Sequence, residues 1–185
     1  MGLRRVGPAA VGHERLEVTM SAEDGAATAD AIDFAVAAYL DDGEWTAANL
    51  PSNRLTSLTA IVEELRRYPG ETGVIGMISV DEDFFILLRV QGQTVRTLIS
   101  DISAADDWPL ARQVADQLGI DPDDIDPDSV EPAGDLGLFE DLGISAQDLG
   151  ALTDDEDAFP DEVLEEIAGT LGFGETYADA LETAG

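Results

Sequence analysis

Three short apolar segments follow one another between residues 74 and 101, and they constrain the fold more than any other feature. They read VIGMISV (74–80), FFILLRVQ (84–91) and TVRTLISD (94–101). Each has the length and composition of a β-strand, and short turns join them, so we expect antiparallel neighbours. The middle segment is apolar on both faces, with Phe84, Ile86, Leu88 and Val90 on one and Phe85 and Leu87 on the other. The pattern therefore predicts a sheet covered on both sides.

Two more strands and a helix are predicted before this block. DFAVAAYL (33–40) and EWTAANL (44–50) flank an Asp-Asp-Gly turn whose Asp-Gly supplies the positive φ angles of a tight hairpin. A helix over 53–68 follows, capped by Ser52 or Asn53 and ended by Pro-Gly. Its apolar stripe is formed by Leu55, Leu58, Val62 and Leu65.

The stretch SDISAADDWPLARQV (100–114) has two readings. Asp106 and Asp107 beside Trp108 could be a catalytic acid pair, or either acid could cap a helix over 107–119 with Pro109 in its first turn. The helix start is the favoured interpretation. The buried stripe would then contain Trp108, Ala111, Val114 and Leu118, with Gly119 as the C-cap.

These elements predict an α+β fold. The expected order is β-β-α-β-β-β-α, which gives a five-stranded antiparallel sheet between helices and a small C-terminal helical unit. Profilin-like and longin/roadblock-like modules share this order, but a shared fold does not assign a function.

Composition suggests where the units begin and end. Residues 1–31 are expected to form a mobile tail, within which Met20 is a candidate natural start. The sheet domain would span 32–120, an acidic linker with three prolines 121–133, and a helical segment 134–185.

The C-terminal segment contains three Asp-Leu-Gly triplets, at 135–137, 141–143 and 148–150. We interpret them as Asp caps, Leu packing positions and Gly stops rather than a repeat. Leu136, Phe139 and Leu142 could form exposed apolar ridges that contact a partner. Alternatively, these side chains pack on the sheet.

The net charge of −31 limits the classes of partner. All nine basic residues are arginines, and 40 residues are acidic. Such a chain repels polyphosphates and anionic membranes, whereas a basic protein would be attracted. A simpler explanation is that the charge maintains solubility. No apolar run approaches the roughly 20 residues of a membrane helix, and no signal sequence is apparent, so we expect a cytoplasmic protein.

Few kinds of chemistry are available to this composition. The chain has no cysteine, no lysine and one histidine, His13, which excludes thiolate sites, P-loops and a deaminase-type zinc site. Asp124, Asp126 and Asp128 match part of a calcium loop, but Ser129 replaces the expected glycine. We favour a solvated acidic linker and expect no cofactor.

Arg89 and Arg96 are the best-placed cations. If residues 92 and 93 form a two-residue turn, the two arginines are cross-strand neighbours on one face. Like charges in this position repel each other, so they should share acidic partners within the chain or bind an anion.

Four stretches occur in order along the chain: DFAVAAY, VIGMISVDEDFFILLRV, SDISAADDWPLARQVADQLG and PDEVLEEIAGTLGFG. Together they resemble the actinobacterial tRNA adenosine deaminase-associated protein family, over roughly residues 32–181. The resemblance implies a link to tRNA adenosine deaminase. It supplies no catalytic residue to transfer, and the chain itself lacks the zinc ligands of a deaminase.

The leading hypothesis is therefore a non-catalytic cytoplasmic accessory protein that binds a basic partner, with tRNA adenosine deaminase as the candidate. Two alternatives stay open. One is an acidic mimic of nucleic acid that occupies a basic groove. The other is an enzyme that uses carboxylates and a metal.

Overall fold

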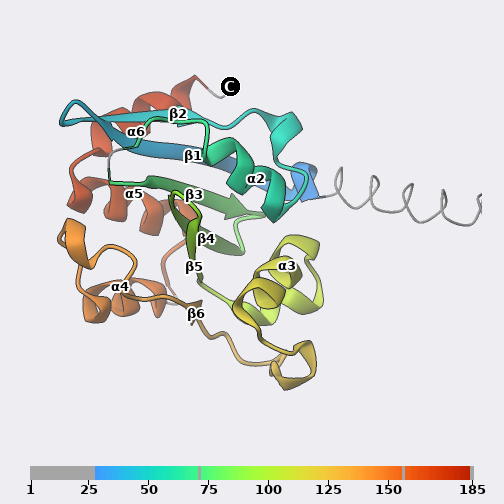
Figure 1. The fold of residues 1–185 in the computed structure, drawn as a ribbon. Coiled ribbons are helices and arrows are strands. Elements are labelled where there is room, and N and C mark those ends of the chain that lie inside the picture. The colour runs from blue at the N-terminus through green and yellow to red at the C-terminus, as the bar shows by residue number, and fades with distance from the viewer. Residues whose placement is uncertain (1–27, 71, 156, 184–185) are drawn as a thin grey trace, which may run out of the picture.

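A six-stranded antiparallel sheet with helices on both faces forms the centre of the protein (Figure 1). The computed structural model describes residues 28–70, 72–155 and 157–183. The strands lie in the order β2-β1-β3-β4-β5-β6. Their bounds are β1 (Ile32–Asp41), β2 (Glu44–Asn49), β3 (Val74–Val80), β4 (Phe84–Gln91), β5 (Thr94–Ile99) and β6 (Ala133–Gly134).

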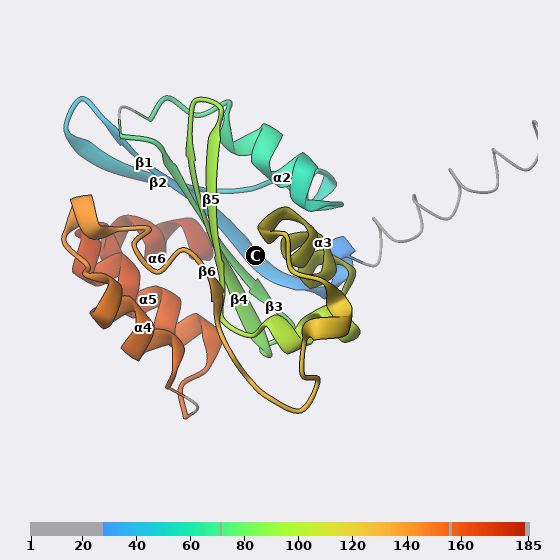
Figure 2. The same ribbon diagram turned by 60° about the horizontal axis from the view of Figure 1, so that its bottom comes forward.

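Two groups of helices cover the sheet. The first comprises α2 (Leu58–Leu65) and α3 (Pro109–Leu118), and the second comprises α4 (Ala146–Thr153), α5 (Pro160–Leu171) and α6 (Gly174–Glu182). Figure 2 shows the two groups on opposite sides of the sheet. Short 3₁₀ turns occupy Ser52–Arg54, Ile102–Asp106, Pro122–Asp124 and Glu140–Leu142.

The alternation of strand β4 divides the core into two clusters, as its sequence predicted. Ile86 and Leu88 pack with Ile61 of α2 on one face. Leu87 packs with Ile167 of α5 on the other face. All five side chains are fully buried. Because both faces of the sheet are covered, the C-terminal helices are part of the same packed body as the sheet.

The prediction of an α+β fold with an antiparallel sheet is confirmed, but the predicted strand count and element order are wrong. The chain returns to the sheet after α3 and adds β6, in which Ala133 and Gly134 pair with Ile99 and Leu98. Gly134 has a φ of 115°, and a Cβ atom there would collide with the carbonyl oxygen of Thr97. Two residues are too few to show the period-2 pattern that reveals a strand.

Two helix starts also differ from the prediction. Ser57 caps α2 by accepting a hydrogen bond from the Ala60 amide at 3.1 Å, so the helix begins well after residue 53. Neither Asp106 nor Asp107 caps α3, because Trp108 occupies the N-cap position, and its side chain makes no capping hydrogen bond. Both acids are exposed and belong to the end of a preceding 3₁₀ turn, which the sequence pattern did not indicate.

Other features of α3 agree with the sequence. Pro109 lies in the first turn, and Gly119 ends the helix with a φ of 76°. Trp108 is half-buried against the first core cluster, with its ring centroid 6.3 Å from that of Phe84. The stretch that contains it is therefore a helix start packed against the sheet.

The predicted N-terminal tail and the candidate start at Met20 lie almost entirely outside the described residues. Residues 28–31 are helical and lead directly into β1. Within the described ranges, no helix combines the length and the apolar character needed to cross a membrane.

Candidate functional site

The two predicted cations lie on the sheet face that the C-terminal helices cover. Arg89 of β4 and Arg96 of β5 are directly opposite each other in the register of the two strands. Arg89 follows Phe85 and Leu87 on that face, where both residues belong to the second core cluster. Two guanidinium groups so placed repel each other unless nearby acceptors compensate their charge.

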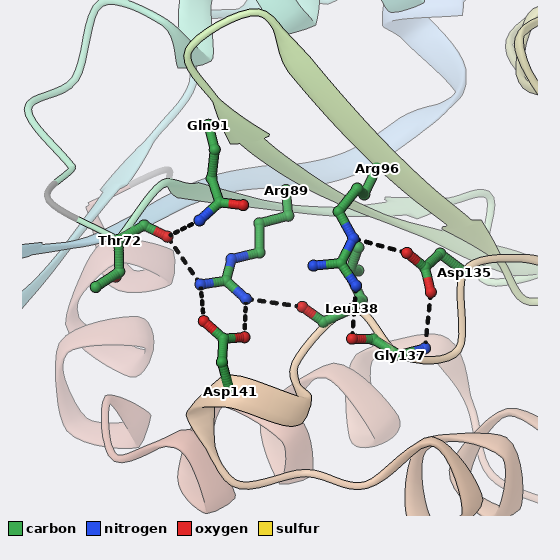
Figure 3. Close-up of polar contacts among 8 residues, drawn as sticks. All are labelled: Thr72, Arg89, Gln91, Arg96, Asp135, Gly137, Leu138 and Asp141. Carbon is green, nitrogen blue, oxygen red and sulfur yellow. Dashed lines mark hydrogen bonds and ion pairs between the residues drawn. The ribbon is translucent and has the colours of Figure 1, made fainter.

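Arg89 is buried beneath the C-terminal segment, with 1% of the residue exposed. Its guanidinium donates to both carboxylate oxygens of Asp141, with the Nη2–Oδ2 distance being 2.7 Å. It also donates to the carbonyl oxygens of Leu138 at 2.9 Å and Thr72 at 2.8 Å (Figure 3). Such a bidentate pair fixes direction as well as distance, so Arg89 holds the 138–141 turn against β4.

Arg96 makes a parallel set of contacts with the preceding turn. Its Nε donates to Oδ2 of Asp135 at 2.6 Å, and its Nη2 donates to the carbonyl oxygen of Gly137 at 2.7 Å. The other carboxylate oxygen of Asp135 accepts from the Gly137 amide at 2.9 Å. Figure 3 shows the two arginines side by side, each bound to its own aspartate.

Two of the three Asp-Leu-Gly triplets therefore have a role that the sequence did not reveal. Asp135 and Asp141 open the first two triplets and pair with the arginines. Asp148 opens the third and lies in the first turn of α4, which Ser145 caps. The pairings join positions 39 and 52 residues apart, so no local pattern could indicate them.

The pairing lowers the pKa of both aspartates. Hydrogen bonding to Arg89 is the main cause for Asp141 and hydrogen bonding to Arg96 is the main cause for Asp135, and burial opposes it in each case. A carboxyl group whose pKa is lower in the folded state than in the unfolded chain stabilises the fold. This stabilisation is fully present at pH values above the unfolded pKa of about 3.8, and it is lost as the pH falls through the folded pKa.

The stability difference between the wild type and Asp141→Asn should therefore depend on acidity. We expect a nearly constant difference in melting temperature from about pH 6 to pH 4 and a shrinking one below that. The unfolded chain then takes up a proton at Asp141 while the folded carboxylate is still ionised, and the effect is lost once the folded carboxylate is protonated as well. Thermal melts across this range measure it. Asp148→Asn should show no such change, and a difference for Asp141→Asn that persists unchanged to about pH 2.5 would contradict the assignment.

The three apolar candidates for partner contact lie against the sheet. Phe139 is fully buried in the second core cluster, and Leu136 and Leu142 are half-buried beside it. The expectation of exposed ridges is thus wrong for Phe139, and the alternative of packing on the sheet describes all three. The reason is that the arginine contacts draw the 135–142 turns onto the sheet face.

The candidate calcium-loop acids face solvent. Asp124, Asp126 and Asp128 are exposed, and Oδ1 of Asp126 accepts from the Asp128 amide at 3.0 Å in a local turn. In the part of the chain that the structure describes, no group of three or more His, Cys, Asp or Glu side chains is placed to hold a metal ion.

Comparison with known proteins places these features in a family. The model of the Rv3753c-like tRNA adenosine deaminase-associated proteins matches residues 33–174, which include both arginine–aspartate pairs. Protein Rv3753c of Mycobacterium tuberculosis is 35% identical over 154 residues, covering 82% of this chain and 89% of that protein. No solved structure gives a significant match. The match over most of both chains confirms the resemblance found in the sequence: the chain belongs to the Rv3753c-like tRNA adenosine deaminase-associated protein family.

Proposed function

We propose that the protein is a non-catalytic, cytoplasmic accessory protein that binds tRNA adenosine deaminase. The family description, which names association with this enzyme, carries the proposal. The net charge of −31 supports it, because an enzyme that acts on tRNA needs a cationic surface for phosphates, and an acidic protein is attracted to such a surface.

The contacts of the arginines strengthen the electrostatic argument. Each arginine in the described ranges makes an ion pair or hydrogen bond within the protein, so its charge is partly compensated there. The six are Arg54, Arg66, Arg67, Arg89, Arg96 and Arg112. The exposed acids greatly outnumber these cations, which gives a negative surface. Such a field increases the rate of encounter with a basic partner, while apolar contacts would determine how long the complex lasts.

The test is binding between the purified protein and the deaminase of the same organism, measured by calorimetry and co-elution. We expect a complex whose dissociation constant rises about tenfold between low and moderate salt, because salt screens the attraction between exposed charges. An unrelated protein of similar net charge is the control and should not co-elute. The absence of both binding heat and co-elution at low salt would reject this partner.

A competition experiment separates the accessory role from mimicry of nucleic acid. If the protein occupies the tRNA-binding groove, added tRNA should displace it from the deaminase. If it is an accessory protein bound elsewhere, a ternary complex should form. We expect the ternary complex, because the cationic surface of the deaminase mainly increases the rate of encounter, while apolar contacts outside the tRNA groove would hold the accessory protein.

A further inference from the structure

A groove of about 560 Å³ lies at one end of the sheet. Asp83 of the β3–β4 turn and Asp101 after β5 line it, and so does Val130, which precedes β6. Asp154 and Asp155, from the connection between α4 and α5, complete the acidic part of the lining. The groove thus brings together four segments of the chain, around residues 83–85, 100–101, 130 and 152–163.

The lining combines apolar and acidic groups. Phe85 and Val163, both buried members of the second core cluster, contribute apolar surface. Four aspartates and no arginine line the groove. A hollow with an apolar wall and charge of one sign selects for a ligand that has an apolar part and the opposite charge.

One exposed apolar side chain lines this groove, and a second belongs to a residue next to the lining in the chain. Among the described residues, the large hydrophobic side chains that are exposed are Val130, at 64%, and Phe159, at 58%. Val130 lines the groove, and Phe159 lies in the chain between two lining residues, Ala158 and Pro160. Val130 thus adds exposed apolar surface to a groove that already has a buried apolar lining, and such surface is available for contact with a partner.

Asp83 of the groove is repelled by neighbouring acids, of which Asp101 also lines the groove. Burial raises the pKa of Asp83, and the nearby charges of Asp101, Asp81 and Asp107 raise it further, while a hydrogen bond with Trp108 lowers it. A cation in the groove would relieve this repulsion. A nucleic acid would increase it, and so would a second copy of this chain with its own charge of −31.

We propose that this groove binds a short segment of a partner protein in which a lysine or arginine stands next to an apolar side chain. The basic group would lie among Asp83, Asp101 and Asp154, and the apolar side chain would cover Val130. The chemistry of the segment follows from the groove alone, whereas its assignment to tRNA adenosine deaminase rests on the proposed function.

The test uses the full chain and two groove variants, Asp154→Arg and Val130→Ser, both at exposed positions. Glu44→Arg is the control, because it changes the net charge by the same amount as Asp154→Arg. Glu44 is exposed on the β1–β2 hairpin, where it is the strand neighbour of Asp41. The groove lies at the opposite end of β1, where Ile32 is the strand neighbour of Val80. Circular dichroism melts establish that all three variants fold.

The first measurement is binding of a fluorescent peptide of alternating arginine and leucine. We expect Asp154→Arg to weaken binding about tenfold and Val130→Ser several-fold, while Glu44→Arg changes it less than about twofold. Equal weakening by the two charge variants, with none from Val130→Ser, would show that the peptide senses only the net charge, and this would overturn the proposal. So would wild-type affinity in both groove variants.

The second measurement repeats the series with the deaminase in place of the peptide. Loss of binding in the groove variants alone places the enzyme in the groove. Tight binding by every variant shows that the deaminase binds elsewhere, which overturns the groove assignment and leaves the proposed function intact. A deaminase that fails to bind the wild type rejects the proposed function, while the peptide result still decides whether the groove accepts a basic segment.

Discussion

Replacing Phe139 with alanine is expected to lower the free energy of unfolding by about 3–5 kcal/mol, the range for emptying a buried aromatic site. The side chain is fully buried between the sheet and the C-terminal helices, in the same cluster as Leu87 and Ile167. The substitution would leave a cavity where the 135–142 turns meet the core. Chemical denaturation of the two proteins measures the difference.

Phe159→Ala is the matched control, because it removes the same side chain from a position that is 58% exposed. This variant should change the free energy of unfolding by less than about 1 kcal/mol. A similarly small loss for Phe139→Ala would mean that the C-terminal segment is not packed on the sheet in solution. In that case the ridge of Leu136, Phe139 and Leu142 would again be a candidate for partner contact.

Asp141→Ala is expected to cost about 2–3 kcal/mol, because it leaves the buried guanidinium of Arg89 without its countercharge. The value lies below that of fully buried pairs, since the Asp141 side chain is 55% exposed while that of Arg89 is 0% exposed. The matched control is Asp148→Ala in the third Asp-Leu-Gly triplet. It should cost less than about 1 kcal/mol, mostly from the favourable position of an acid in the first turn of α4.

A second substitution tests whether the loss of stability arises from the buried, unpaired charge of Arg89. Adding Arg89→Met to Asp141→Ala should recover at least about half of the lost stability, because an apolar side chain of similar length needs no countercharge in the core. Recovery stays incomplete, since the carbonyl oxygen of Leu138 loses its donor. Chemical denaturation of the wild type, Asp141→Ala, Arg89→Met and the double variant forms a double-mutant cycle. No recovery, or equal losses in Asp141→Ala and Asp148→Ala, would contradict this account.

Local patterns were sufficient for the elements that have a clear period. The three strands between residues 74 and 99 and the hairpin before them appear where the alternation predicted them. The positive φ angles of Asp42 and Gly43 are those that the Asp-Gly turn required. The pattern of β4 also indicated correctly that both faces of the sheet are covered, because a strand that is apolar on both faces must be buried on both.

Elements that show no hydrophobic periodicity were either not predicted or predicted with the wrong start. β6 has two residues, and its backbone approaches Thr97 so closely that only glycine fits at position 134. The preference of aspartate for the N-cap position predicted that α3 begins at Asp106 or Asp107. In the structure Trp108 is the N-cap residue and packs near Phe84, and the helix begins at Pro109. In each case contacts with a distant part of the chain decided the geometry, and a local pattern carries no information about them.

The sequence by itself determined five of the six strands, the two apolar faces of the sheet, the acidity and the family, since each follows from local alternation, composition or matching stretches. It also placed Arg89 opposite Arg96 through a two-residue turn. Only the tertiary structure decided that Asp135 and Asp141 compensate these charges and that Phe139 is buried in the second core cluster. It alone brings Asp83, Val130 and Asp154 to one groove. The physical reason is that ion pairs and grooves depend on distances in space, and the sheet brings together residues that the chain holds far apart.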